Sequence, residues 1–474
     1  MTTTAHNAAV LTGVEPATRT LARFAAELQY DAIPADVMEA AKTLILDCLG
    51  CTLYAARLPW SRLAQDYVES EGARPVASVW GTPLRTSPSL AALANGTAGH
   101  GFEIDDVDHR SGLHVGSVTV PVVLGLAEAE GSWTGRDFLT ALVAGCEVGL
   151  RVGIAIQPGH FMRGYHPQGT IGPIAAAASA ARALHLDPDR TGHAFGIAGS
   201  MAAGLMGAQQ GGMVKRLHAG RSGQSGIVAA QLAQRGFTGT DDVFDIEFGG
   251  YCSTLEGVPG ATERLRSRIG EVGTEWLTPN VGYKLHASCA ANHSTLDVVS
   301  DLRTRHDLRA EDVVSVKVTT SNHTFVHCGW PYVPGDVVNA QMSLRYGVAA
   351  MLSTGSAFVR EYTDARVADP QLVELAARVD VEPDEAIDAL GSDKRHTVAV
   401  KIATRDGRVV EGGADHRRGS QFEPVGRAEI AEKFLLLTEP LEGIDGGALL
   451  ARVLGLEELN DIEELARLLR TGEV

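Results

Sequence analysis

The fold class is decided by residues 134–153, which read TGRDFLTALVAGCEVGLRVG. Apolar residues recur in this stretch at helical spacing, and Thr134 stands where a helix N-cap would stand. Similar runs precede and follow it. We predict helices over residues 36–56, 89–99, 118–129, 134–156, 171–184 and 224–235. Because these runs are rich in alanine and glycine, we expect closely packed helices and a compact multi-helix core.

The pattern changes near Thr278. Valine-rich alternation predicts strands at 313–320 and 396–404, with a weaker one at 379–382. Helical runs at 293–304, 340–352 and 369–378 lie between or beside them, so this region reads as a smaller α+β unit. After Gly419 the pattern is helical again. We therefore predict a mainly α protein with an α+β second domain: a helical domain over 1–278, the α+β unit over 279–414, and a helical return over 415–474.

Composition narrows the function. The chain has 474 residues and a net charge of −17, which argues against sequence-independent binding to nucleic acid. The most apolar stretch, 118–127, is too short to span a membrane, and the first ten residues, MTTTAHNAAV, lack the pattern of an export signal. We therefore expect a cytoplasmic protein with reduced thiols and with no membrane partner. Cys48 and Cys51 form a lone C-x-x-C in a helical run, which we interpret as packing.

The first candidate for chemistry is the glycine-rich connection at 95–117. It carries His100, Glu103, Asp105, Asp106, Asp108, His109 and His114. So many titratable groups between two apolar helices favour catalysis or substrate binding, since loops on a rigid scaffold often carry such groups. A solvated loop and a metal site are the alternatives. No metal is expected, because the loop lacks a spacing such as H-E-x-x-H.

The second candidate is 164–170, GYHPQGT, where His166 precedes an alanine-rich helical run. Free backbone N–H groups at a helix start would stabilise a carboxylate there. The alternative is a Pro/Gly turn with a threonine cap. Both can hold, because a cap can support a site.

The third candidate is 209–224, QQGGMVKRLHAGRSGQ. If it is helical, Lys215 and His218 share a face, and Arg216 and Arg221 add charge. In an acidic protein this run predicts a local patch that binds anions, with an exposed basic helix face as the alternative.

The fourth candidate is 283–293, YKLHASCAANH, at the predicted domain junction. Clefts between domains are common ligand sites, and Cys289 could serve there as an acid/base or a nucleophile; a buried structural cysteine is the alternative. The sequence has no dinucleotide fingerprint, no P-loop and no G-x-S-x-G elbow, so redox and phosphoryl chemistry lack support.

These segments, in this order, resemble the MmgE/PrpD family, which includes 2-methylcitrate dehydratase, cis-aconitate decarboxylase and iminodisuccinate epimerase. The resemblance begins at 44–50 (LILDCLG) and continues through the D-D-x-x-H loop, 164–170 and 215–221 (KRLHAGR). It extends to 341–346 (QMSLRY) and 418–420 (RGS). It implies a helical domain made from both ends of the chain, a smaller α+β lid, a homodimer, and a site between the domains that needs no cofactor.

The resemblance also implies roles for single residues. The D-x-D-D-T run of the decarboxylases corresponds to 103–107, where Glu103 replaces the aspartate and Val107 the threonine, and their lid histidine corresponds to Cys289. We assign catalysis and substrate binding to two sets. The catalytic set is His114, His166, Lys215 and Cys289; the substrate-binding set is Glu103, Asp105, Arg216, His218, Arg221 and Tyr332.

The shared chemical problem is a proton on a carbon next to a carboxylate of a small di- or tricarboxylate. Cations would disperse the negative charge left by its removal, and a histidine or Cys289 would take the proton. Because Val107 and Cys289 depart from the decarboxylase pattern, we expect a different acid or a different outcome. Dehydration of the 2-methylcitrate type is the leading expectation, and epimerisation and decarboxylation are the alternatives. A carboxylate-binding relative without catalysis is the non-enzyme alternative.

Overall fold

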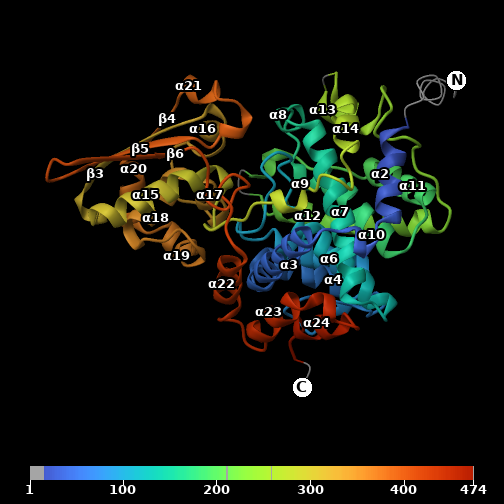
Figure 1. Ribbon diagram of the computed structural model, residues 1–474. Coiled ribbons are helices and arrows are strands. Elements are labelled where there is room, and N and C mark those ends of the chain that lie inside the picture. The colour runs from blue at the N-terminus through green and yellow to red at the C-terminus, as the bar shows by residue number, and fades with distance from the viewer. Residues whose placement is uncertain (1–14, 210–211, 258, 473–474) are drawn as a thin grey trace.

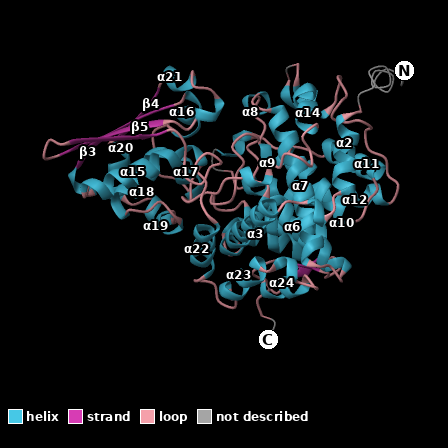
Figure 2. Cartoon of the chain, in the orientation of Figure 1, coloured by secondary structure: helices cyan, strands magenta, loops and turns pink. Residues whose placement is uncertain are grey.

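The computed structural model describes residues 15–209, 212–257 and 259–472, and these ranges are mainly helical with one small mixed sheet (Figure 1; Figure 2). The predicted mixture of a helical part and an α+β part is confirmed, whereas the boundaries at 278 and 414 stay predictions. The N-terminal stretch that we inspected for an export signal lies outside the described residues.

The helical body accounts for most of the chain before residue 270. Its helices are α2 (Ala17–Glu27), α3 (Ala35–Ala55), α4 (Pro59–Ser70), α5 (Pro88–Gly99), α6 (Gly116–Glu130), α7 (Gly135–Ile156), α8 (Gly159–Met162), α9 (Pro167–Thr170), α10 (Gly172–Ala183), α11 (Pro188–Ser200), α12 (Val214–Gln234), α13 (Tyr251–Glu256) and α14 (Ala261–Ile269). A two-stranded ribbon, β1 (Ala77–Ser78) and β2 (Arg85–Thr86), lies among them. The six predicted helices are all present, but α12 begins ten residues before its predicted start at 224.

Helix α7 contains the stretch that decides the fold class. Its N-terminus is closed by a capping box, in which the Thr134 hydroxyl accepts from the Asp137 backbone N–H and the Asp137 carboxylate accepts from the Thr134 backbone N–H. By length and composition this helix could cross a membrane, which our inspection of the sequence missed. However, 94% of its apolar window is buried inside the protein, as is typical of a core helix.

Small residues let α12 approach α5. A Cβ at Gly220 would lie 2.0 Å from the Leu93 carbonyl oxygen, a distance that no side chain tolerates. The predicted close packing of helices is therefore confirmed at this contact. It fixes the first turns of α12, which carry Lys215 and Arg216, beside the loop that follows α5.

The α+β part contains a four-stranded sheet in the order β4-β3-β5-β6. Its strands are β3 (Val313–Thr320), β4 (Val379–Pro383), β5 (Val398–Thr404) and β6 (Val409–Ala414). Strand β3 is parallel to β4 and antiparallel to β5, and β6 is antiparallel to β5. The sequence analysis did not predict β6, because its VVEGGA run contains two glycines and lacks a clear alternation.

The helices of the α+β part accompany this sheet. They are α15 (His293–His306), α16 (Asn322–Cys328), α17 (Val337–Met342), α18 (Leu344–Thr354), α19 (Asp364–Val367), α20 (Pro370–Ala377) and α21 (Glu385–Asp388). The single helix predicted over 340–352 is two helices, because Ser343 ends α17 with extended backbone and its side chain caps α18.

The C-terminal helices α22 (Arg427–Thr438), α23 (Gly446–Leu454) and α24 (Glu463–Leu468) lie below the helical body in Figure 1, with α22 beside α3. Lys433 pairs with Asp47 at 2.6 Å, and Phe434 packs against Gly50, where a Cβ would stand 3.1 Å from its ring. These contacts give a physical reason for Asp47 and Gly50 in the LILDCLG run. Lys433 also donates to the Ile104 carbonyl, so α22 supports the loop that carries Glu103.

Candidate active site

A cavity of about 500 Å³ is lined by residues from both parts of the fold. The helical body contributes the loop after α5 and the start of α12. The α+β part contributes the segment before α15, helix α16 and the connection before β5. The volume is in the range of small-molecule sites. Five of our predicted site residues line it: Glu103, His114, His166, Lys215 and Cys289.

Glu103 is the centre of a buried charge cluster. Its Oε1 accepts from Lys215 and Arg216, and its Oε2 lies 2.9 Å from Lys284 Nζ. Its backbone has φ 56°, in the left-handed region that non-glycine residues seldom adopt. Such strain persists where surrounding contacts enforce it, often at functional sites. Burial raises the pKa of Glu103, but the three cations outweigh it and hold that pKa well below its usual range.

The two lysines on Glu103 differ in their proton affinity. Burial, together with Arg216 and Lys284, lowers the pKa of Lys215 despite its contact with Glu103. Burial also acts on Lys284, but Glu103 and Asp105 outweigh it and raise its pKa. Lys284 is therefore a fixed positive charge, whereas Lys215 is the better proton donor of the two.

Asp105 positions two histidines, His100 behind the cavity wall and His114 on it. His100 Nδ1 donates to Asp105 Oδ2 at 2.8 Å, and His114 Nδ1 lies 3.1 Å from the same oxygen. Burial lowers the pKa of His100 to about 3, so its ring is neutral and its Nε2, 3.4 Å from Lys215 Nζ, accepts. With Nδ1 turned to Asp105, His114 keeps Nε2 for a ligand.

Gln168 explains part of the GYHPQGT motif. Its carbonyl oxygen accepts from the His114 backbone N–H at 3.0 Å, and its amide donates to the His114 carbonyl at 2.8 Å. This double contact fixes the backbone of His114 from α9. The motif therefore supports the catalytic candidate His114 as well as supplying His166.

His166 and His218 form a neutral pair. Their Nδ1 atoms are 2.8 Å apart, so one ring donates and the other accepts. Burial, with Lys215 nearby, lowers the pKa of His166 well below its usual value and that of His218 to about 4. The predicted helical face that joins Lys215 and His218 is present, and His218 reaches the cavity through His166.

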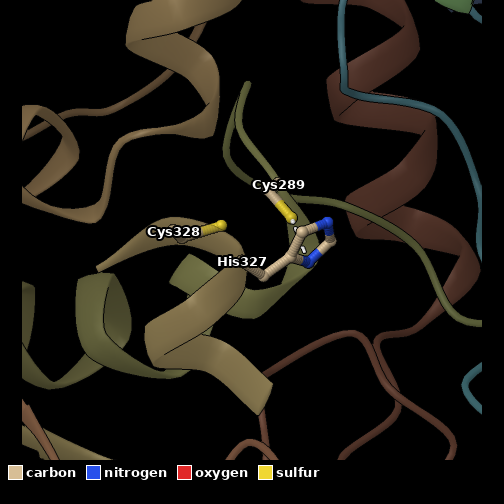
Figure 3. Close-up of side chains that lie close together, drawn as sticks. All are labelled: Cys289, His327 and Cys328. Carbon is tan, nitrogen blue, oxygen red and sulfur yellow. Dashed lines mark hydrogen bonds between the residues drawn. The ribbon is translucent and has the colours of Figure 1, made fainter. Parts of the chain in front are cut away.

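Cys289 and His327 face each other on the α+β side of the cavity. Figure 3 shows the thiol of Cys289 and the ring of His327 turned toward each other, with Cys328 to one side; Sγ and Nδ1 are 3.7 Å apart. His327 Nε2 donates to Gln209 at 2.6 Å, so Nδ1 is free to take the Cys289 proton and then donate to the thiolate. The Cys328 thiol as donor and His327 hold the pKa of Cys289 well below its usual value, although burial opposes this. Cys289 is thus suited to act as a thiolate.

Two clusters have donor atoms close enough to hold a metal ion. They are Cys289, His327 and Cys328, and His100, Asp105 and His114, with the donor atoms of each cluster within 4.8 Å of one another. Sulfur and imidazole ligands would suit a borderline metal such as zinc. In the structure these atoms are instead engaged with one another and with Gln209 and Lys215.

Two predicted binding residues lie away from the cavity. Arg221 is exposed and donates to Gln224. It lies six residues after Lys215, so the helix turns its side chain about 120° away from the face that carries Lys215. The Tyr332 hydroxyl donates to the Val367 carbonyl at 2.7 Å, inside the α+β part. Arg216 and Asp105 are buried beneath the wall and act through Glu103 and the histidines.

Sequence reasoning missed several residues of the cavity. Among them are Lys284, His327 and three arginines: Arg110, Arg395 and Arg417. Lys284 stands in the quoted 283–293 segment, where its charge next to a predicted cleft was a usable indication. His327 follows no motif, and only the packing of α16 against the segment before α15 brings it to Cys289.

Comparison with known proteins identifies the family of the chain. Residues 19–260 match the MmgE/PrpD N-terminal domain, and residues 286–446 match the MmgE/PrpD C-terminal domain. The chain is similar to a cis-aconitate decarboxylase-like protein of Aspergillus oryzae, 31% identical with 96% of this chain and 98% of that protein covered. It is also similar to the cis-aconitate decarboxylases of Aspergillus terreus (29%; 95% of each chain) and Homo sapiens (27%; 92% and 90%). With both family domains matched in order along the chain, this protein belongs to the MmgE/PrpD family.

Proposed function

We propose that this protein is a cofactor-independent lyase that decarboxylates a small unsaturated tricarboxylate similar to cis-aconitate. The observation that carries the proposal is the buried cluster in which Lys215 and Lys284 share the carboxylate of Glu103 at the wall of the cavity. Two positive charges at a water-poor wall are what a carboxylate substrate and a developing carbanion require.

The chemistry follows from the charges. When the carbon–carbon bond to a carboxylate breaks, CO₂ leaves and the electron pair moves through the neighbouring double bond into a second carboxylate. Lys284, whose pKa is raised by Glu103 and Asp105 over the opposing effect of burial, supplies the permanent charge that stabilises this anion. Lys215, whose pKa burial lowers, can then give a proton to carbon. His114, held by Asp105 and Gln168, and Cys289, held near His327, are the other groups that can carry this proton.

The sequence motifs favoured dehydration, whereas the names of the relatives favour decarboxylation, which we therefore propose first. Dehydration would expel a β-hydroxyl from a similar anion. Epimerisation would return the proton to the opposite face of the carbon, which requires two proton-carrying groups. His114 and Cys289, which line the cavity from separate segments of the chain, would be that pair. These outcomes are distinguished by their products.

The test is incubation in D₂O with cis-aconitate, citrate, methylcitrate and iminodisuccinate, each followed by proton NMR with a CO₂ sensor. We expect CO₂ release from cis-aconitate, with one solvent deuteron bound to carbon in the product. A new vinyl signal from a hydroxy acid without CO₂ would reassign the enzyme as a dehydratase, and deuterium exchange without net conversion would reassign it as an epimerase. Binding of these acids without any reaction would leave a carboxylate-binding relative and contradict the proposal.

A further inference from the structure

Three arginines on the cavity wall have buried N–H groups without a hydrogen-bond partner among the described residues. Arg417 is 1% exposed; its Nη1 donates to the Tyr283 carbonyl at 2.8 Å, but its Nε and Nη2 have no partner. Arg395 donates from Nη2 to the His109 carbonyl, and its Nε has none. In Arg110 the same holds for Nε and Nη2. All three side chains line the cavity that contains Glu103 and Lys215.

Such donors are costly to bury. A polar group withdrawn from water without a partner costs free energy, and a charged one costs more. Native proteins therefore pair nearly all of them. Five unpartnered guanidinium N–H positions on one cavity wall indicate that their partner is something the cavity receives.

The acidic groups around these arginines do not form ion pairs with them. Asp297, Asp108, Asp393 and the thiolate of Cys289 act on the arginines electrostatically, but within the described ranges none of them forms an ion pair with the three guanidinium groups. Asp108 uses Oδ1 on the Ser111 N–H. The imidazoles of His109, His323 and His396 also face this region; burial and the neighbouring arginines lower their pKa values, to about 3 for His109 and His323, so all three are neutral at pH 7. The unpartnered N–H groups of these arginines are therefore available to an anion that enters the cavity.

We propose that Arg110, Arg395 and Arg417 form a second anion subsite, which holds a substrate carboxylate remote from the reacting carbon and selects tricarboxylates over dicarboxylates. The inference rests on the proposed function in that the reacting end of the substrate lies at Lys215 and Lys284. The planar fork of a guanidinium presents two parallel donors that match the two oxygens of a carboxylate. A substrate that engages both clusters gains orientation as well as affinity.

The experiment is calorimetric titration with two acids that cannot react, propane-1,2,3-tricarboxylate and glutarate. We expect the wild-type protein to bind the tricarboxylate at least about 10-fold more tightly, since charge-assisted hydrogen bonds contribute about 1.5–3 kcal/mol. In Arg417→Met and Arg395→Met this preference disappears, because tricarboxylate binding weakens while glutarate binding changes little. Arg408→Met is the matched control, since Arg408 is an exposed arginine of the α+β part that pairs with Asp406.

An unchanged preference in both variants, or an equal loss for both acids, overturns the inference. Inorganic phosphate is titrated as well: phosphate bound more tightly than the tricarboxylate and lost in Arg417→Met would mean that the subsite holds phosphate, and would also overturn it. If Arg417→Met does not fold, Arg417→Lys keeps the charge but removes the fork, and the same loss of preference is expected. If the arginine-dependent preference is found but no acid is turned over, the proposed function fails and the inference stands. If cis-aconitate is turned over but the preference is absent, the inference fails and the proposed function stands.

Discussion

Lys284 Nζ lies 2.9 Å from Oε2 of Glu103, and this contact ties the segment that leads into the α+β part to the loop of the helical body. The other oxygen of Glu103 is held by Lys215 and Arg216 from α12. One carboxylate thus fixes the distance between the two walls of the cavity. Its negative charge also offsets the cost of burying three cations, whose side chains are at most 6% exposed.

The first prediction concerns Glu103→Gln. Removal of one charge from a buried ion pair costs about 3 kcal/mol, because the partners remain buried and unpaired. The depressed pKa of Glu103 sets the pH dependence: its contribution to stability is fully present above the unfolded value of about 4.3 and is lost as the pH falls through the folded value. Urea unfolding should therefore show a large difference from wild type at pH 7 that shrinks at pH 3.

Glu382→Gln is the control for this comparison. Glu382 is partly exposed and pairs with Lys317 on the surface of the sheet, where ion pairs contribute little. A difference between wild type and Glu103→Gln that stays constant from pH 7 to pH 3 would contradict the assignment of Glu103 as an ionised partner.

The second prediction concerns the thiol of Cys289. An ordinary cysteine has a pKa of about 8.5 and loses reactivity tenfold for each pH unit below it. Because the Cys328 thiol and His327 lower the pKa of Cys289, iodoacetamide should alkylate Cys289 selectively at pH 6. Burial raises the pKa of Cys48, Cys51, Cys146, Cys252 and Cys328, and these should stay unmodified. Peptide mass spectrometry measures both.

His327→Ala should slow this alkylation, since it removes one of the two groups that stabilise the thiolate. The matched control is His306→Ala, an exposed histidine at the end of α15. Alkylation of Cys289 that falls tenfold for each pH unit in the wild-type protein, with no effect of His327→Ala, would leave Cys289 as an ordinary buried cysteine.

The longest helices of the core, three of the four strands of the mixed sheet and several residues of the candidate site could be predicted because their patterns are local, whereas helices such as α2, α4 and α11 were not predicted. The 134–153 run carries its own periodicity and cap, and Lys215 stands in a short basic run of an acidic chain. Strand β6 was missed because glycine weakens the alternation that identifies strands. The start of α12 was missed because Gly220 and its neighbours pack through backbone contact and not through an apolar stripe.

The rest depends on contacts between distant segments. His327 reaches Cys289 across 38 positions, and Lys284 reaches Glu103 across 181. Arg221 was placed in the site because a basic run was read as one patch, but a helix separates charges around its axis. Sequence spacing therefore identified which segments form the site, whereas the structure was needed to show which side of each segment faces it.

The third prediction concerns metal removal. Asp105 Oδ2 already has two imidazole nitrogens, at 2.8 and 3.1 Å, and His327 uses both ring nitrogens on protein groups. We therefore expect prolonged dialysis against EDTA to leave turnover of cis-aconitate unchanged, and elemental analysis to find well below one metal per chain. Loss of activity that zinc restores would instead make one of these clusters a metal site.

The fourth prediction compares two basic residues of α12. Lys215→Met removes the proton donor and one charge at the wall, and should reduce kcat by at least about 100-fold, the scale observed when a transition-state donor is removed. Arg221→Met, on the other side of the same helix, should leave kcat and KM unchanged, because Arg221 is exposed, donates to Gln224 and does not line the cavity. Steady-state kinetics with matched thermal melts separates lost chemistry from lost folding. Equal losses in both variants would mean that the basic run acts as a diffuse anion-attracting surface, and Lys215 would lose its place as the proton donor.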